Sequence, residues 1–200
     1  MLARAAPEFR GRHPARHGRR GLGLAPLLAL ALLCSSVPAS ADSLKPWTAG
    51  RLPPLALDRL DGEPITLDAL RGRPVVVHFF ATWCAPCIEE MASLNAFAAT
   101  PGAPVVLAVN VGEIDARVRN FFSKRPVSFP ILLDRDRATM KAWKVEGLPT
   151  SFVLDRELKP ALKTEEPLDW ASPAVAAALA TLSPAEPPIQ PAKDKGETPR

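Results

Sequence analysis

The chain is poor in the side chains that bind metal ions and haem. It has 200 residues but only three cysteines and three histidines, and beyond residue 41 only Cys84, Cys87 and His78 remain. Structural zinc sites use four ligands, so these three side chains fall short of one. Covalent haem attachment needs a histidine directly after the second cysteine of a Cys-x-x-Cys pair, and Ile88 stands there. We therefore expect no metal site and no bound cofactor.

Long apolar runs and an excess of charge are also missing. The apolar stretch from Leu22 to Leu33 has 12 residues, whereas a membrane-spanning helix needs about 20. Residues 1–41 hold six arginines and one glutamate, and residues 42–200 hold 19 basic and 20 acidic side chains. The basic character of the chain therefore belongs to its first 41 residues, and the rest offers no basic surface for nucleic acid.

Residues 1–41 have the form of a secretory signal peptide. An arginine-rich segment precedes the apolar stretch, and the small residues Ala39-Ser40-Ala41 follow it as a cleavage site. Cleavage there would remove Cys34 and leave one domain, residues 42–182, with a proline-rich tail at 183–200 that we expect to be disordered. An uncleaved leader that serves as an N-terminal membrane anchor is the alternative. In both cases we expect the domain to be exported.

Two cysteines separated by two residues lie where an apolar strand gives way to a helix. Residues 75–80 form a near-continuous apolar run, typical of a buried strand, and apolar residues recur with helical spacing over 85–99. Side chains one helical turn apart are about 5–6 Å apart, so Cys84 and Cys87 can form a disulfide, and Pro86 is tolerated in the first turn. The positive end of the helix favours the thiolate of Cys84. We therefore expect Cys84 to attack and Cys87 to resolve the mixed disulfide.

A purely structural disulfide is the alternative. In the chain-entropy account, closing a four-residue ring contributes about 1.9 kcal/mol, against about 4.7 kcal/mol for a hundred-residue loop. So short a ring stabilises a fold weakly, which favours the redox role.

Strands and helices alternate along the rest of the chain. A hairpin is predicted to pair residues 55–57 with 65–67 around Asp61-Gly62. Further strands are predicted at 75–80, 105–109, 131–133 and 151–154, and helices at 85–99, 114–123, 138–144 and 173–182, the last with Ser172 as its N-cap. This alternation indicates an α/β sheet that is covered on both faces.

Several motifs occur together in this region. They are Trp83-Cys84-Ala85-Pro86-Cys87, Gly147-Leu148-Pro149-Thr150, and the flanking segments 67–74, 89–91, 109–111 and 129–131. In combination they resemble the thioredoxin fold in its exported bacterial branch, the TlpA/ResA family of thiol-disulfide oxidoreductases. The resemblance covers about residues 52–182. It implies a central mixed sheet flanked by helices, with an N-terminal β-hairpin extension.

The resemblance also implies a client-binding surface around the cysteines. In the family, the proline that matches Pro149 is cis, lies against the cysteine pair and leaves the backbone of Leu148 free to pair with a client. Trp83, Pro86 and Thr150 complete the predicted surface. As alternatives, Pro149 is an ordinary turn proline and Trp83 a plain core aromatic.

Two side chains are candidates to relay the proton of Cys87. Glu90 lies one helical turn past Cys87 and matches a functional glutamate of ResA-like proteins. His78 stands where thioredoxins carry a buried acid, and an imidazole is a suitable base near neutral pH. The structural alternatives are a solvated carboxylate for Glu90 and a core histidine satisfied by one hydrogen bond for His78. Glu89 is expected at the surface.

One segment departs from the family pattern. Asp155-Arg156-Glu157-Leu158 replaces the usual Asp-x-x-Gly turn, and residues 160–167 are charged and poor in β formers. We therefore expect the edge strand in this segment to be irregular.

The sequence thus predicts an exported enzyme that reduces client disulfides through Cys84 and Cys87. The resemblance implies a periplasmic monomer whose clients carry CxxC or CxxCH thiols, as in cytochrome c maturation or oxidase copper-site assembly. Because the periplasm is oxidising, a membrane thiol reductase of the DsbD or CcdA type would supply electrons. The alternatives are a copper-binding assembly chaperone that uses both cysteines and His78, a thiol peroxidase, and an oxidase of the DsbA kind.

Overall fold

The computed structural model describes residues 44–182. The predicted leader and the proline-rich tail lie outside the described residues. The strands are β1 (Lys45–Pro46), β2 (Ala56–Leu57), β3 (Ile65–Thr66), β4 (Val75–Phe80), β5 (Val105–Val111), β6 (Ile131–Asp134), β7 (Thr150–Leu154) and β8 (Pro160–Thr164). The helices are α1 (Ala85–Ala98), α2 (Asp115–Lys124), α3 (Ala138–Ala142) and α4 (Pro173–Ala180). Within residues 44–182, none of the helices combines the length and the apolar character that a bilayer crossing demands.

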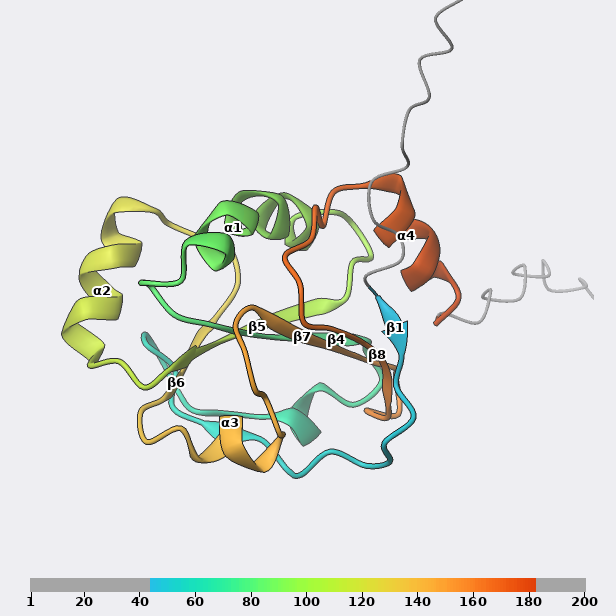
Figure 1. Cartoon of the computed structure of the whole chain (residues 1–200), viewed down its shortest axis with the longest axis horizontal. Coiled ribbons are helices and arrows are strands. Elements are labelled where there is room, and N and C mark those ends of the chain that lie inside the picture. Colours follow the sequence, from blue (N-terminus) through green and yellow to red (C-terminus); the bar gives the residue numbers. More distant parts are fainter. Residues whose placement is uncertain (1–43, 183–200) are drawn as a thin grey trace, which may run out of the picture. The chain divides into compact units, whose positions relative to one another are not determined.

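A six-stranded mixed sheet forms the centre of the fold (Figure 1). Its strand order is β1-β8-β7-β4-β5-β6, and β2 and β3 form the separate hairpin that the sequence predicts. The central strand β4 runs parallel to β5 and antiparallel to β7. All six residues of β4 are buried, which explains its uninterrupted apolar sequence. The thioredoxin-like mixed α/β fold is therefore confirmed.

Side chains of β4 alternate between two hydrophobic cores. Val76 and Phe80 pack in the core shared with α1, α2 and α4. Val75, Val77 and Phe79 pack in the core that faces α3 and the hairpin side of the sheet (Figure 1). His78 has the same parity as Val76 and Phe80, so the strand period directs it toward the α1 face.

The edge strand that the sequence predicts to be irregular does form, and it carries one irregularity, because Val153 of β7 pairs with Leu162 and Leu154 with Pro160. Residues 160–164 form β8, which pairs antiparallel with β7 and, on its outer side, with β1. A register shift near Val153 is its only departure from regular pairing with β7 among the described residues. Lys163 lies over two aromatic rings, 5.3 Å from the Phe152 centroid and 5.7 Å from that of Trp47. The aliphatic part of the Lys163 side chain thus covers apolar surface. Intrinsic β propensity does not count this packing.

Two turns place a bulky residue where glycine is usual. Leu158 has a φ of 61°, and Asp155 holds this turn by accepting hydrogen bonds from the backbone N–H groups of Glu157 and Lys159. At the end of α3, Lys144 has a φ of 53°. Non-glycine residues rarely adopt this left-handed conformation. Helix α3 therefore ends two residues before the predicted boundary.

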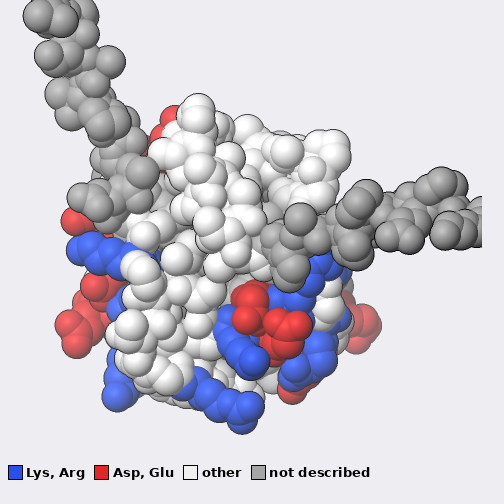
Figure 2. Space-filling view, turned by 90° about the vertical axis from the view of Figure 1, so that its right-hand side faces the viewer, with Lys and Arg blue, Asp and Glu red and all other residues white. Residues whose placement is uncertain are grey.

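The start of α4 agrees with the prediction. The Ser172 hydroxyl accepts a hydrogen bond from the Val175 N–H at 3.4 Å, and Pro173 is the first helical residue. Figure 2 shows the molecule from the side of α4 and β1, where uncharged side chains dominate one half and charges of both signs alternate in the other. Over the described residues of this face, no extended patch carries a single sign.

Candidate active site

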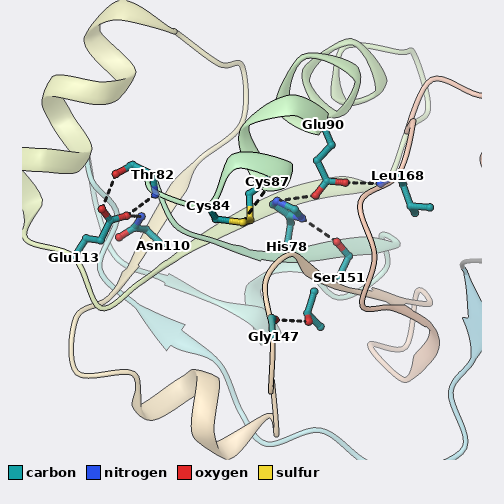
Figure 3. Close-up of a disulfide and its surroundings, with 11 residues drawn as sticks. His78, Thr82, Cys84, Cys87, Glu90, Asn110, Glu113, Gly147, Ser151 and Leu168 are labelled. Carbon is teal, nitrogen blue, oxygen red and sulfur yellow. Dashed lines mark hydrogen bonds and ion pairs between the residues drawn. A yellow bond between two sulfur atoms is a disulfide. The ribbon is translucent and has the colours of Figure 1, made fainter.

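The two cysteines form a disulfide at the N-terminus of α1 (Figure 3). Cys84 is the N-cap of the helix, and its Sγ accepts a hydrogen bond from the Cys87 N–H at 3.3 Å. The Cα atoms are 5.3 Å apart, and Pro86 is half-buried in the first turn of the helix, where it displaces no intrahelical hydrogen bond. Cys87 is fully buried, whereas 5% of Cys84 is exposed. Of the two cysteines, Cys84 is therefore the one that keeps some exposure to solvent.

A buried carboxyl and a buried imidazole join α1 to β4. The Oε1 atom of Glu90 lies 3.5 Å from Nε2 of His78, and the His78 Nδ1 atom lies 2.9 Å from the Ser151 hydroxyl on β7. Figure 3 shows the imidazole between these two groups. Only 5% of Glu90 is exposed, whereas its neighbour Glu89 is exposed as expected. The alternative of a solvated carboxylate at Glu90 is therefore wrong.

The second oxygen of Glu90 is fixed by the segment before α4. Oε2 accepts hydrogen bonds from the Leu168 N–H at 2.7 Å and from the indole N–H of Trp170 at 3.2 Å. Both donors stabilise the carboxylate form, yet burial raises the pKa of Glu90 to about 7. The carboxyl is therefore close to half-ionised at neutral pH.

Burial acts on His78 in the opposite direction. It lowers the pKa of the imidazole to about 3, so His78 is neutral at physiological pH. Among the described residues, neither Nε2 of His78 nor Oε1 of Glu90 has a hydrogen-bond partner. One proton placed between these two atoms would satisfy both of them.

A second buried carboxylate holds the turn that precedes the nucleophile. Glu113 accepts hydrogen bonds from the Thr82 N–H and the Thr82 hydroxyl, both at 2.6 Å, and from the Asn110 amide at 2.7 Å. We call this contact the Thr82–Glu113 clamp (Figure 3). Sequence reasoning missed both Glu113 and Ser151, although Asn110 lies in a segment that carries the family resemblance. The Thr82 hydroxyl donates its proton to Glu113, so that proton is not directed at a cysteine sulfur.

The proline loop lies at the same end of the sheet as the cysteines. The Leu148–Pro149 peptide bond is cis, as the resemblance implies. Thr150 pairs with Phe79 near the end of β4, and its hydroxyl donates to the Gly147 carbonyl at 2.8 Å. Pro149 and Thr150 are buried and Leu148 is half-buried.

Trp83 is exposed over 63% of its surface, so the alternative of a core aromatic is wrong. It stands on the rim of the site, directly before Cys84. Among residues 44–182, no group of three or more His, Cys, Asp or Glu side chains is arranged to hold a metal ion.

Comparison with known proteins finds a family match and close relatives. The family model described as "AhpC/TSA family" matches residues 49–159. The thiol-disulfide oxidoreductase ResA of Bacillus subtilis (strain 168) is 39% identical over 110 residues, which are 54% of this chain and 61% of that protein. The ResA of Bacillus thuringiensis (strain Al Hakam) is 31% identical over 121 residues, or 60% of this chain and 70% of that protein. The match to the first relative thus spans less than two thirds of its length.

A solved structure shows the same fold. The crystal structure of a Chlorobium tepidum protein assigned as a thiol:disulfide interchange protein DsbE superposes with a TM-score of 0.61 at 28% identity. The superposition covers 66% of this chain and 96% of that one.

Proposed function

Because the chain belongs to the AhpC/TSA family, we propose that it is an exported thiol-disulfide oxidoreductase that mainly reduces the disulfides of client proteins. The disulfide between Cys84 and Cys87 carries this proposal. Cys84, at a helix N-terminus, keeps slight exposure to solvent, whereas Cys87 has none. That asymmetry suits a nucleophile and a resolving thiol.

The reaction starts from the reduced dithiol. The thiolate of Cys84 attacks one sulfur of the client disulfide, forms a mixed disulfide and releases the other client sulfur as a thiolate. Cys87 then loses its proton and attacks the Sγ of Cys84, which releases the second client sulfur. The client gains two electrons and two protons, and the protein is left as the disulfide that the structure holds.

Cys87 needs a base, because its thiol is buried and only the thiolate attacks. We assign this role to the Glu90 carboxylate, one helical turn away, whose pKa of about 7 suits proton exchange at neutral pH. His78, within 3.5 Å of Glu90, positions the carboxyl and can share its proton.

The cellular setting follows from the leader and the chemistry. A signal peptide, or an uncleaved anchor, would place the domain in the periplasm, where a reductase needs electrons from a membrane thiol reductase of the DsbD or CcdA type. Clients with CxxC or CxxCH thiols, in cytochrome c maturation or copper-site assembly, fit a protein that resembles ResA. Trp83, Pro86 and Leu148 would form the surface that such clients contact, whereas Pro149 and Thr150 are buried and would support the loop behind it.

The decisive experiment is trapping with Cys87→Ser in the native host. The variant should accumulate mixed disulfides through Cys84, and mass spectrometry would identify the attached clients. The matched control is Cys84→Ser, which should trap nothing. Partners recovered only with Cys84→Ser would refute the assignment of the two roles.

Assays on the purified protein separate this proposal from its rivals. Reduction of insulin supports the reductase. Peroxide consumption without insulin reduction would indicate a thiol peroxidase, and tight stoichiometric Cu(I) binding without insulin reduction would indicate a copper chaperone. A reduction potential well above the value of about −270 mV for thioredoxin would indicate an oxidase instead.

A further inference from the structure

A basic groove lies beside the nucleophilic cysteine. Its volume is about 290 Å³, and it lies between the turn before Cys84 and helix α2. Its lining residues are Thr82, Trp83, Arg117, Asn120, Phe121, Lys124 and Arg125. Three of these seven side chains are cationic and none is a carboxylate.

Two exposed apolar side chains lie next to the clamp residues, and one of them, Trp83, lines the groove. Trp83 is 63% exposed and Ile114 is 71% exposed, and they are the large hydrophobic residues that residues 44–182 leave open to solvent. Each directly follows one member of the Thr82–Glu113 clamp, whose hydrogen bonds are 2.6 Å long. The clamp therefore brings two apolar residues from separate segments to one place. Single exposed apolar residues need no explanation, but Trp83 both lines the groove and directly precedes Cys84, so a segment bound in the groove would meet it.

The acidic groups near the groove are already engaged. Glu113 is buried and accepts the hydrogen bonds of the clamp, and its only cationic contact in the described structure is Arg117 at 3.9 Å. Asp115, at the start of α2, receives two hydrogen bonds from Arg135 at 2.7 and 2.8 Å. Arg135 also lowers the pKa of Asp115, so this carboxyl stays ionised and paired. These acids therefore do not neutralise Lys124 and Arg125.

The cations are held on an accessible face of α2. Lys124 and Arg125 are exposed at the end of the helix, and the Arg125 guanidinium lies 4.8 Å from the centroid of the Phe121 ring. Such stacking fixes the direction of the charge without removing it from solvent.

We propose that this groove docks client segments that carry acidic residues beside their reactive cysteine. The carboxylates would lie along Arg117, Lys124 and Arg125, while Trp83 and Ile114 contact apolar neighbours of the disulfide. The inference rests on the proposed function, because the occupant is the client that Cys84 attacks. The positive charge of the groove favours acidic client segments, and it chiefly raises the rate at which they meet the protein.

The test uses the pre-reduced protein and two synthetic disulfide peptides. The peptides share one sequence around the disulfide and differ only in flanking glutamates or flanking lysines. Stopped-flow measurement of protein oxidation gives a second-order rate constant for each. At low ionic strength we expect the glutamate peptide to react about tenfold faster. This preference should shrink as salt is added, since exposed charges are screened.

Charge reversal provides the specific variant. K124E/R125E should lose the preference for the glutamate peptide and react faster with the lysine peptide, a gain that a misfolded protein cannot show. The matched control is K141E/K159E, which changes net charge equally at exposed residues outside the groove and should keep the wild-type preference.

The outcomes separate the two proposals. If neither peptide oxidises the wild-type protein, the proposed function fails and the docking inference fails with it. If both peptides react at equal rates, or the preference persists in K124E/R125E, the oxidoreductase stands and the groove is not the docking site. Equal loss of preference in K141E/K159E would also overturn the inference, because net charge alone would then explain it. If K124E/R125E does not fold, the single variants K124E and R125E take its place, and each should weaken the preference for the glutamate peptide.

Discussion

Nε2 of His78 lies 3.5 Å from Oε1 of Glu90, although both side chains are buried. Two full charges in such a place would lose a large hydration energy. The pair avoids this loss because burial leaves His78 neutral and keeps Glu90 partly protonated at neutral pH. A carboxyl held at this balance can accept a proton from a neighbouring thiol.

Replacement of Glu90 should slow the second step of the reaction. In Glu90→Gln we expect resolution of the mixed disulfide to fall by about 100-fold near pH 7, because a general base is lost. The wild-type rate should rise with pH through about 7, where Glu90 becomes the carboxylate, and the variant should lack this rise. Rapid-quench measurement of client release tests both. The exposed neighbour provides the control, since Glu89→Gln should match the wild type. A larger effect in His78→Ala than in Glu90→Gln would assign the relay to His78.

The same pair predicts an unusual pH dependence of stability. Between about pH 4.5 and 6.5 the folded pair binds one proton, on Glu90, whose pKa is raised from 4.5 to about 7. The unfolded chain also binds one, on His78, whose pKa falls from 6.5 to about 3 only on folding. The two contributions cancel, so this pair leaves the free energy of unfolding nearly constant with pH in that window.

Removal of either partner should expose the contribution of the other. In Glu90→Gln only His78 of the pair titrates, and between about pH 3 and 6.5 it binds a proton in the unfolded state but not in the folded state. The free energy of unfolding should therefore rise with pH over this range, relative to the wild type. In His78→Asn only Glu90 of the pair titrates, and between about pH 4.5 and 7 it binds a proton in the folded state but not in the unfolded state. The free energy of unfolding should therefore fall as pH rises over this range. Each slope approaches about 1.4 kcal/mol per pH unit. Urea unfolding of the oxidised protein over this range is the measurement, and slopes of the same sign would contradict the shared-proton pair.

The Thr82–Glu113 clamp should contribute measurably to stability. Glu113→Gln replaces an acceptor oxygen with an N–H₂ group that faces donors, and we expect a loss of about 1–3 kcal/mol in the free energy of unfolding. Thr82→Val removes one hydrogen bond and should cost about 1 kcal/mol. The double variant should lose less than the sum, because the residues contact each other. The exposed Glu63→Gln serves as the control, and strict additivity in the double variant would count against the clamp.

The end of α3 offers a stabilising substitution. The N–H of Lys144 bonds to the Lys141 carbonyl and that of Val145 to the Met140 carbonyl, at 3.1 and 3.0 Å, which is the pattern of a Schellman cap that normally holds glycine. Lys144→Gly should therefore stabilise the protein by about 1 kcal/mol. The same change inside the helix, Lys141→Gly, should destabilise it by about 1 kcal/mol. Thermal unfolding of both variants checks the opposite signs, and a lower melting temperature for Lys144→Gly would refute the expectation.

Local features of the site could be predicted from the sequence, whereas contacts between distant segments could not. The position of Cys84 at a helix start follows from apolar spacing, and the cis bond before Pro149 from the family resemblance. The contact of Thr82 with Glu113 depends on how the loops after β4 and β5 lie side by side. That of His78 with Ser151 depends on the register between β4 and β7. No periodicity in a single chain encodes either relation.

The extent of pairing along β8 could not be predicted for a related reason. Its residues read as charged and poor in β formers, yet they pair on both sides with β7 and β1. A strand that is covered on both edges gains hydrogen bonds and packing that intrinsic propensity does not count. Trp83 is the opposite case. Its hydrophobicity alone would place it in the core, yet it lies at the surface, directly before Cys84.

The short strand β1 helps to protect the edges of the central sheet. It occupies part of the outer edge of β8, and at the opposite edge the backbone around Arg59 bonds to β6 through Leu60–Ile131 and Leu133–Asp58. Exposed sheet edges recruit extended segments of other proteins and seed aggregation. With both edges partly covered, the central sheet offers few unpaired backbone groups to the extended segments of the clients proposed above.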